Sequence, residues 1–242
     1  MKDYLLKERK ELVDMWNAFM VDGATFTEND IPICPTFIPD GIPTDFISYH
    51  DATILHNEEI SNGNYDYKVN KCIHFYIYDQ YFDRPEDGIW THPYEALDII
   101  NHFNGIITPD FSTFLDFPHP IKIYNTYRMR AFGHWMYLNK NPVINNVRWG
   151  TPDTWNYSFD GIPHNSIISI GTVASGLTEI ENRTDFELGL KKLISVVQPE
   201  TVIIYGSSKY KSLDPLREAG INIVSIPSKR NTIYKEGERK NK

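Results

Sequence analysis

Short apolar runs alternate with segments of helical period along most of the chain. From residue 71 onward the runs are CIHFYIY, GIITP, PVINNVRW, NSIISIGT, TVIIYGS and INIVSIP. Two weaker runs, IPIC and DFISY, lie in the Pro-rich residues 30–70 and bring the candidate strands to about eight. Strand–helix–strand repeats imply right-handed crossovers. The pattern therefore predicts an α/β fold, a mostly parallel sheet with flanking helices that is either irregular (β/α)-barrel-like or open and doubly wound.

Five segments have the apolar period of a helix. Residues 3–20 are amphipathic, and THPYEALDIINHF carries Pro93 in its first turn, where proline costs little. KSLDPLREAG forms a short helix closed by Gly220. The other two helices are PIKIYNTYRMRAFGHWMYL, with an expected inward stripe of Ile123, Tyr127, Ala131, Trp135 and Leu138, and a helix opened by the capping box Thr184-x-x-Glu187, with Phe186, Leu190, Leu193, Ile194 and Val197 inward.

Two further segments have no such period. NEEISNGNYDYKVNK is polar and is expected to form a surface turn or hairpin tip. Residues 150–165 contain no obvious helix, which together with the Pro-rich start argues against a regular barrel. We expect one α/β domain over residues 1–228, with a helix in residues 1–20 and an irregular part in residues 30–70, followed by a basic flexible tail, residues 229–242.

Composition and charge restrict the class of partner. Hydrophobic residues make up 41% of the 242 residues and charged residues 23%, as in soluble globular proteins. The net charge is −8, and the tail, with six basic and two acidic residues, leaves −12 for the rest. Nucleic acid is therefore not an expected partner, except through the basic tail. The sequence indicates no oligomeric state.

The chain has two cysteines, no signal peptide pattern and no apolar run of membrane-spanning length. We therefore expect a cytoplasmic protein, in a bacterial or phage-infected cell, without membrane contact. The sequence contains no GxGxxG, P-loop, GxSxG, HExxH or CxxC pattern, so it predicts no metal site and identifies no cofactor.

Chemistry is expected where the parallel strands end, because ligands of such folds bind beyond the carboxyl ends of the strands. Asp110 is the candidate general base or ion ligand, and it is equally a candidate cap of its own turn. Asp79 and Asp160 are further candidate acids, although the first fits a surface loop and the second a turn before glycine. Arg128 or Arg130 is the expected anion contact. The other candidate ligand-binding residues are Ser112, Asn125, Tyr127, Trp149 (as a stacking wall), Thr172, Gly206 and Ser207.

An ordered set of motifs resembles a known family. YDQYF, W-x-x-P, ITPDFS, YNTYRMRAFGHWM, VRWG, FDGIP-x-x-S and a VIIYG strand, over about residues 30–228, are similar to the family catalogued as domain of unknown function 4417. The resemblance implies an origin in Gram-positive bacteria, their phages or mobile elements, and it carries over no activity. The family-like positions are Asp79, Asp110, Ser112, Asn125, Tyr127, Arg128, Arg130, Trp149, Asp160 and Gly161. The chain departs from the pattern at Asp79-Gln80, where the family pattern has two acids, and this weakens a two-carboxylate metal site.

Two functional hypotheses follow. In the first, the protein binds a small polar, nucleotide- or sugar-like ligand at the carboxyl edge of its sheet, with hydrolase or transferase activity as an extension. In the second, it is a non-enzymatic phage accessory protein that binds a host protein or nucleic acid. Convergence of Asp79, Asp110, Arg128 and Asp160 on one concave site would favour the first hypothesis.

Overall fold

The computed structural model describes residues 2–3, 14, 16–173, 175, 177 and 180–228. Its main sheet has seven parallel strands in the order β3-β4-β5-β6-β7-β8-β9. The strands are β3 Phe46–Ser48, β4 Cys72–His74, β5 Ile106–Ile107, β6 Val143–Asn146, β7 Ile167–Gly171, β8 Thr201–Tyr205 and β9 Asn222–Ile226. The parallel sheet is confirmed, and the five strands expected at its centre hold the five inner positions. IPIC forms no strand and takes part only in the isolated bridge Phe26↔Pro32.

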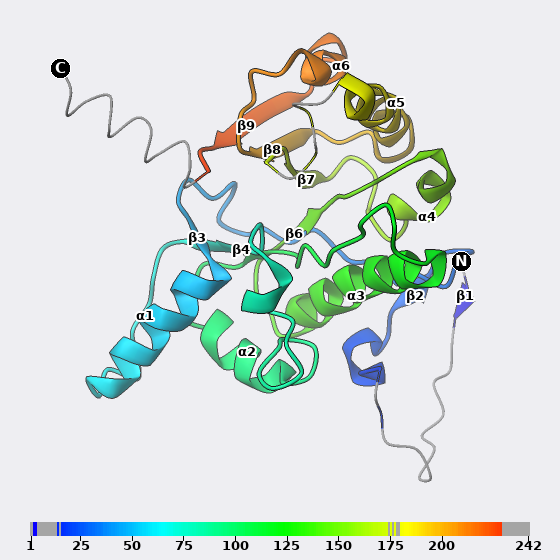
Figure 1. Cartoon of the computed structure of the whole chain (residues 1–242). Helices are drawn as coiled ribbons and strands as arrows, with labels where there is room; N and C mark the ends of the chain where they lie inside the picture. Colours follow the sequence, from blue (N-terminus) through cyan, green and yellow to red (C-terminus); the bar gives the residue numbers. More distant parts are fainter. Residues whose placement is uncertain are drawn as a thin grey trace, which may run out of the picture.

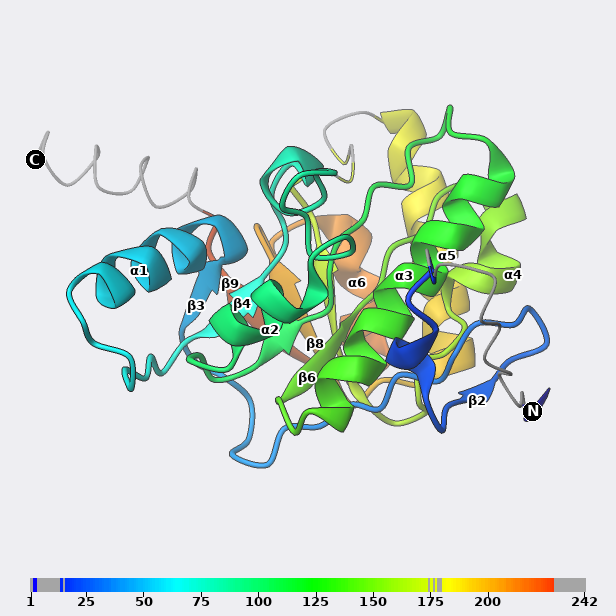
Figure 2. The same cartoon turned by 90° about the horizontal axis from the view of Figure 1, so that it is seen from below.

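Strand order and chain order coincide, so the sheet has no point at which the order reverses. It curls into a half-barrel with the helices outside, and the doubly wound alternative is excluded (Figure 1). Helices α1 to α3 lie beside β3–β6, and α5 and α6 lie beside β7–β9 (Figure 1). The helices are α1 Tyr49–Ser61, α2 Pro93–Ile100, α3 His119–Leu138, α4 Trp155–Ser158, α5 Ile180–Val197 and α6 Asp214–Glu218. Figure 2 shows α1 at one side of the sheet and α5 at the other.

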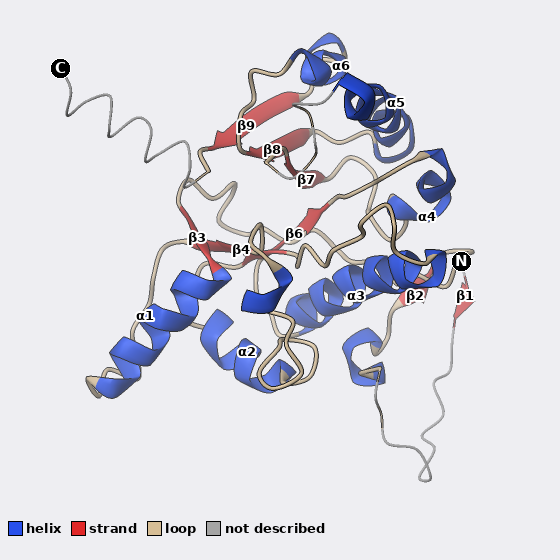
Figure 3. Cartoon of the chain, viewed as in Figure 1, coloured by secondary structure: helices blue, strands red, loops and turns tan. Residues whose placement is uncertain are grey.

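Smaller elements connect these layers. Single 3₁₀ turns are η1 Ala18–Val21, η2 Asp79–Tyr81, η3 Pro152–Thr154 and η4 Lys211–Leu213. A two-stranded antiparallel sheet pairs β1 Lys2–Asp3 with β2 Thr25–Phe26. Long loops join the short strands throughout (Figure 3). None of the helices in the described residues is both long and apolar enough to cross a membrane.

The apolar core has three parts. One lies between β4–β6 and helices α2 and α3, and a second between β7–β9 and helices α5 and α6. A third fills the concave side of the sheet with Cys72, Ile107, Ile144, Ile203, Tyr205 and Ile226. Phe186, Leu190, Leu193 and Val197 of α5 are buried in the second part, as their spacing predicts.

A Pro-rich segment closes the amino end of the half-barrel. Residues 32–42, called the strap here, pass between the first residues of β6 and β7. Phe37 and Val143 exchange two backbone hydrogen bonds of 2.9 and 2.7 Å, and Thr36 Oγ1 donates to the carbonyl of Ile167 over 3.4 Å. Ile38 and Ile42 of the strap pack against the concave core. Apolar side chains thus close the amino end, whereas the carboxyl end is lined by polar groups.

One element prediction was wrong, and the inward face of one confirmed helix was predicted only in part, because both buried faces contain polar residues. NEEIS belongs to α1 and not to a surface turn; the helix is capped by Ser48, whose Oγ accepts from the Asp51 amide over 3.2 Å. The buried residues of α1 are Tyr49, Ala52 and His56. Because one of them is a histidine, the sequence of this helix shows no regular apolar period. In α3, Leu138 of the expected stripe is exposed, while the buried face carries polar groups such as Asn125 and Arg130.

The predicted start of α5 was also wrong. The helix begins at Ile180, so the box Thr184-x-x-Glu187 lies within it, and no Gly or Pro in residues 180–183 prevents that extension. Most of the helix predicted for residues 3–20 lies outside the described residues. Of its described part, Asp3 is in β1 and Ala18–Val21 form η1. The basic tail, residues 229–242, also lies outside the described residues.

Candidate functional site

A polar network lies at the carboxyl end of the half-barrel, where β5, β6 and β7 finish. Asn146, the last residue of β6, donates through Nδ2 to Asp110 Oδ1 over 2.8 Å. Arg148 Nη1 donates to Asp110 Oδ2 over 3.0 Å. The Tyr76 hydroxyl lies 3.0 Å from Asn146 Oδ1 and 2.7 Å from Ser169 Oγ of β7. Asp110 and four other side chains, from four neighbouring strands and the loops that follow them, are therefore connected by hydrogen bonds; we call these five residues the Asp110 network.

The hydroxyl groups connect the Asp110 network to the backbone of the sheet. The Tyr76 hydroxyl has a single proton and two acceptors within reach, Ser169 Oγ and Asn146 Oδ1. Ser169 Oγ in turn donates to the carbonyl of Ile203 in β8 over 3.1 Å. Asp110 accepts from both Asn146 and Arg148, so its carboxylate is the acceptor on which these two donors converge.

The position of Tyr76 at the carboxyl end of the half-barrel is fixed by the contacts of its ring. The ring stacks on Tyr205 with centroids 4.8 Å apart, and a Cβ added to Gly171 would lie 2.9 Å from it. Burial raises the pKa of Tyr76 well above its usual value, and the negative charge of Asp110 acts in the same direction. The phenol therefore stays protonated at neutral pH and serves as a donor.

Arg148 is the positively charged member of the Asp110 network, which lies at the rim formed by the carboxyl ends of the strands. Its side chain is 20% exposed and that of Asp110 is 15% exposed, so both reach the surface without being fully solvated. Among the described residues, Arg148 has one hydrogen-bonded partner, Asp110, which it contacts through Nη1. A guanidinium has five N–H donors, so an edge of Arg148 stays available to a ligand.

A second polar cluster adjoins the first through the loop after β5. Asp79 accepts from the Ser112 amide over 3.0 Å and from the Ser112 hydroxyl over 2.7 Å. Asn125 Nδ2 donates to the Ser112 carbonyl, and Asn125 Oδ1 accepts from Arg128 Nη2 over 2.8 Å. Asp79, Ser112, Asn125 and Arg128 are thus brought together, and they fix the loop that carries Asp110 onto α3.

The charge of Arg128 is already matched within the protein. Its Nη1 donates to both carboxylate oxygens of Asp83, at 2.8 and 2.9 Å, and its guanidinium lies 3.9 Å from the centre of the Phe111 ring. Burial raises the pKa of Asp83, and Arg128 opposes that rise. This pairing fits a residue that fastens the loop after β4 to α3 better than it fits a free anion contact.

Arg130 and Asp160 lie in a different network. The guanidinium of Arg130 is fully buried and donates to the carbonyls of Asp160, Asn146 and Ser158 at 2.9, 2.8 and 3.3 Å. Burial lowers the pKa of Arg130 to about 10. The Asp160 carboxylate accepts from Thr27 and Asn29 over 2.8 and 2.9 Å, so it fastens the amino-terminal segment. Asp160 therefore does not join Asp79, Asp110 and Arg128 at the rim.

The other predicted residues have contacts of their own. Trp149 is partly buried and packs against Phe186 and the backbone of Gly189 in α5, at the edge of the core. Tyr127 lies against Tyr124 on α3, with a buried hydroxyl. Thr172 Oγ1 lies 3.2 Å from the Tyr205 carbonyl and 3.3 Å from that of Ser207, across the turn where Gly206 has φ +115°. These three hold the core or the turn after β8.

Four members of the Asp110 network were missed by the sequence argument: Tyr76, Asn146, Arg148 and Ser169. Arg148 stands next to Trp149 in VRWG, and the aromatic residue was chosen as the ligand contact in its place. A usable signal existed for Asn146 and Ser169, because each is a polar residue within an apolar strand, and buried polar side chains need partners.

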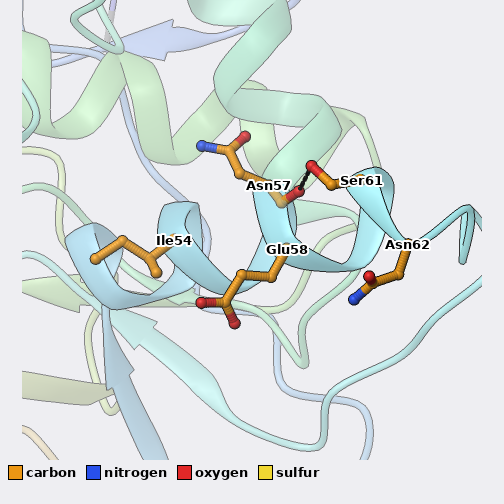
Figure 4. Close-up of a pocket in the computed structure, with 5 residues that line it drawn as sticks. All are labelled: Ile54, Asn57, Glu58, Ser61 and Asn62. Carbon is orange, nitrogen blue, oxygen red and sulfur yellow. Dashed lines mark hydrogen bonds between the residues drawn. The ribbon is translucent and has the colours of Figure 1, made fainter.

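A surface depression elsewhere offers less chemistry. A hollow of about 410 Å³ lies along α1 and is lined by Ile54, Asn57, Glu58, Ser61 and Asn62, whose side chains are drawn in Figure 4. One internal hydrogen bond joins Ser61 Oγ to the Asn57 carbonyl over 2.6 Å. The lining comes from a single helix and its cap, and it brings together no opposed donors and cations.

Comparison with known proteins gives the family. The model of the family described as Domain of unknown function (DUF4417) matches residues 32–219, which include the whole Asp110 network. The chain belongs to this family. It is 30% identical over 173 residues to the Gene 1 protein of Mycobacterium phage L5, covering 72% of each chain. It is 28% identical over 173 residues to the Gene 1 protein of Mycobacterium phage D29, covering 72% of this chain and 61% of that protein. No solved structure matches the chain.

Proposed function

We propose that the protein binds a small polar molecule with an anionic group, nucleotide- or sugar-like, at the carboxyl end of its half-barrel. The observation that carries this proposal is the Asp110–Arg148 pair. It places a carboxylate acceptor and a guanidinium with spare donors side by side at the rim. Arginine holds phosphate and carboxylate groups well because its donors form a planar fork. Position supports the same conclusion, since ligands of parallel α/β folds bind at this end.

The reactive group that the proposed site offers is the carboxylate of Asp110, which can act as an acceptor toward a ligand. Two donors, Asn146 and Arg148, hold the carboxylate of Asp110 in place at 2.8 and 3.0 Å, so it is positioned to accept a hydrogen bond from a ligand hydroxyl. In a hydrolase or transferase, Asp110 would then be the general base and Arg148 would bind the anionic group. This role replaces the earlier assignment of the anion contact to Arg128 or Arg130, whose donors are used within the protein.

A non-enzymatic accessory role is the second candidate. The loop after β5 exposes Phe114 and Leu115 close in sequence to Ser112, and α3 exposes Ile121 in its first turn. Exposed apolar side chains that gather in one region favour contact with another protein. In either role, the phage-encoded relatives support action in the cytoplasm of an infected bacterial cell.

The test is a ligand screen by thermal unfolding, followed by calorimetric titration of each hit. Small phosphates, carboxylates, nucleotides and sugar phosphates are compared on the wild type, Arg148→Met and Asp110→Asn. A ligand that raises the melting temperature of the wild type and is lost in both variants supports the proposal. Arg84→Met is the control, because Arg84 forms an exposed pair with Asp87 away from the Asp110 network. Equal binding by the wild type and Arg148→Met would refute the proposal.

A further inference from the structure

Two exposed aromatic rings stand at the carboxyl end of β4. Tyr78 is 78% exposed and directly precedes the single turn η2, and Tyr81, its last residue, is 42% exposed. The Tyr81 ring lies 4.6 Å from the His50 ring, centre to centre, at the start of α1. Large rings are normally buried, because each one removes much apolar surface from water. Exposed rings beside a polar rim are therefore available for stacking.

The loop that carries these rings is fixed to the loop that carries Asp110. Asp79 directly follows Tyr78, and its two carboxylate oxygens accept the amide and hydroxyl of Ser112. Ser112 lies two residues after Asp110. The pair Arg128–Asp83 fastens the other side of the same loop to α3. Tyr78 and Asp110 thus belong to loops at neighbouring strand ends that are joined by two charge-assisted hydrogen bonds, so the backbone that carries the ring keeps its position relative to Asp110.

We propose that the ligand of this site is a ribonucleoside phosphate whose base stacks on Tyr78. Arg148 then holds the phosphate, and Asp110 accepts a hydrogen bond from a ribose hydroxyl. This inference rests on the proposed function and narrows its ligand class. A sugar phosphate would use Arg148 and Asp110 and leave the aromatic face unused. A nucleoside phosphate uses all three groups, since every base has a flat face that stacks on aromatic side chains.

The experiment compares three probes by calorimetric titration: the four ribonucleoside monophosphates, ribose 5-phosphate and the unphosphorylated nucleosides. The wild type is expected to bind at least one monophosphate more tightly than ribose 5-phosphate or its nucleoside. Tyr78→Ala is expected to weaken that monophosphate about tenfold, the size of a lost stacking contact, and to leave ribose 5-phosphate unchanged.

Tyr65→Ala is the matched control. Tyr65 is 65% exposed and lies in the loop after α1, at the amino end of the sheet. The Tyr65→Ala variant should bind the monophosphate with the affinity of the wild type. Tyr81→Ala removes the second exposed ring of the same loop and tests whether that ring also contacts the base.

The outcomes separate this inference from the proposed function. If ribose 5-phosphate binds as tightly as the monophosphates, or if Tyr78→Ala behaves like Tyr65→Ala, the nucleoside assignment is overturned while the Asp110–Arg148 site stands. If Arg148→Met also leaves the binding of every phosphate unchanged, the proposed function fails as well.

Discussion

Arg130→Lys tests whether the buried guanidinium of α3 is a structural residue. Arg130 is fully buried and reaches three carbonyl groups at once, those of Asp160, Asn146 and Ser158. These carbonyls belong to the end of β6, to the last residue of α4 and to the segment that follows α4, so one side chain joins α3 to both regions. Lysine keeps the charge but offers its donors from a single nitrogen, whereas arginine spreads them over a planar fork.

The expected loss follows from counting the bonds. A lysine that reaches one carbonyl leaves two others without a donor, and a hydrogen bond to a charged group contributes roughly 1.5–3 kcal/mol. Arg130→Lys should therefore lower the free energy of unfolding by about 3 kcal/mol or more. The assay is urea denaturation followed by circular dichroism, with midpoint and slope fitted for each variant.

The control is Arg84→Lys, at an exposed pair with Asp87, where no measurable change is expected. A loss below about 1 kcal/mol in Arg130→Lys would be smaller than a single charged hydrogen bond. That result would refute the structural role and return Arg130 to the set of candidate ligand contacts.

Three further predictions concern stability. Leu193→Ala should lower the unfolding free energy by about 2–5 kcal/mol in urea denaturation, since the side chain is fully buried; a loss below about 1 kcal/mol would contradict its place in the core. Gly189→Ala should cost about 1–3 kcal/mol in the same assay, because the added Cβ would lie 2.3 Å from the Trp149 ring; an unchanged midpoint would show that this ring moves aside easily. Burial lowers the pKa of His56 below 6.5, partly opposed by Asp98, so stability from the neutral ring is present above pH 6.5 and is lost as the pH falls below it. His56→Gln should therefore flatten the decline of melting temperature between pH 7 and 5, and an unchanged slope would count against this origin.

The parallel sheet could be predicted because most of its strands are visible in the sequence as short apolar runs. The strands β4, β5 and β8, which lie in CIHFYIY, GIITP and TVIIYGS, are buried on both faces, as strands of a covered parallel sheet are. The helices between such runs indicate parallel crossovers. The half-barrel could not be separated from a doubly wound sheet, because strand order depends on which neighbours pair and not on the pattern within one strand.

The candidate site was predictable only in part. Asp110 was found because it directly follows a strand, and position after a strand is visible in the sequence. Arg148 was missed because the anion contact was assigned to Arg128 or Arg130 in the helix before β6, and only the structure shows that these two have their donors engaged. Tyr76 was missed because its place at the carboxyl end of the half-barrel depends on Gly171 and Tyr205, residues far away in the sequence.

The most direct test of the central claim compares the affinities of the wild type and of Arg148→Met for one ribonucleoside monophosphate. Both affinities are measured by calorimetric titration at the same salt concentration. Loss of the guanidinium removes the phosphate contact but leaves Asp110 bonded to Asn146 over 2.8 Å, so the fold should persist. The account predicts binding by the wild type that Arg148→Met weakens at least tenfold, with the variant still folded and unfolding cooperatively without ligand. Equal affinity in the two proteins would contradict a ligand site at the Asp110–Arg148 rim.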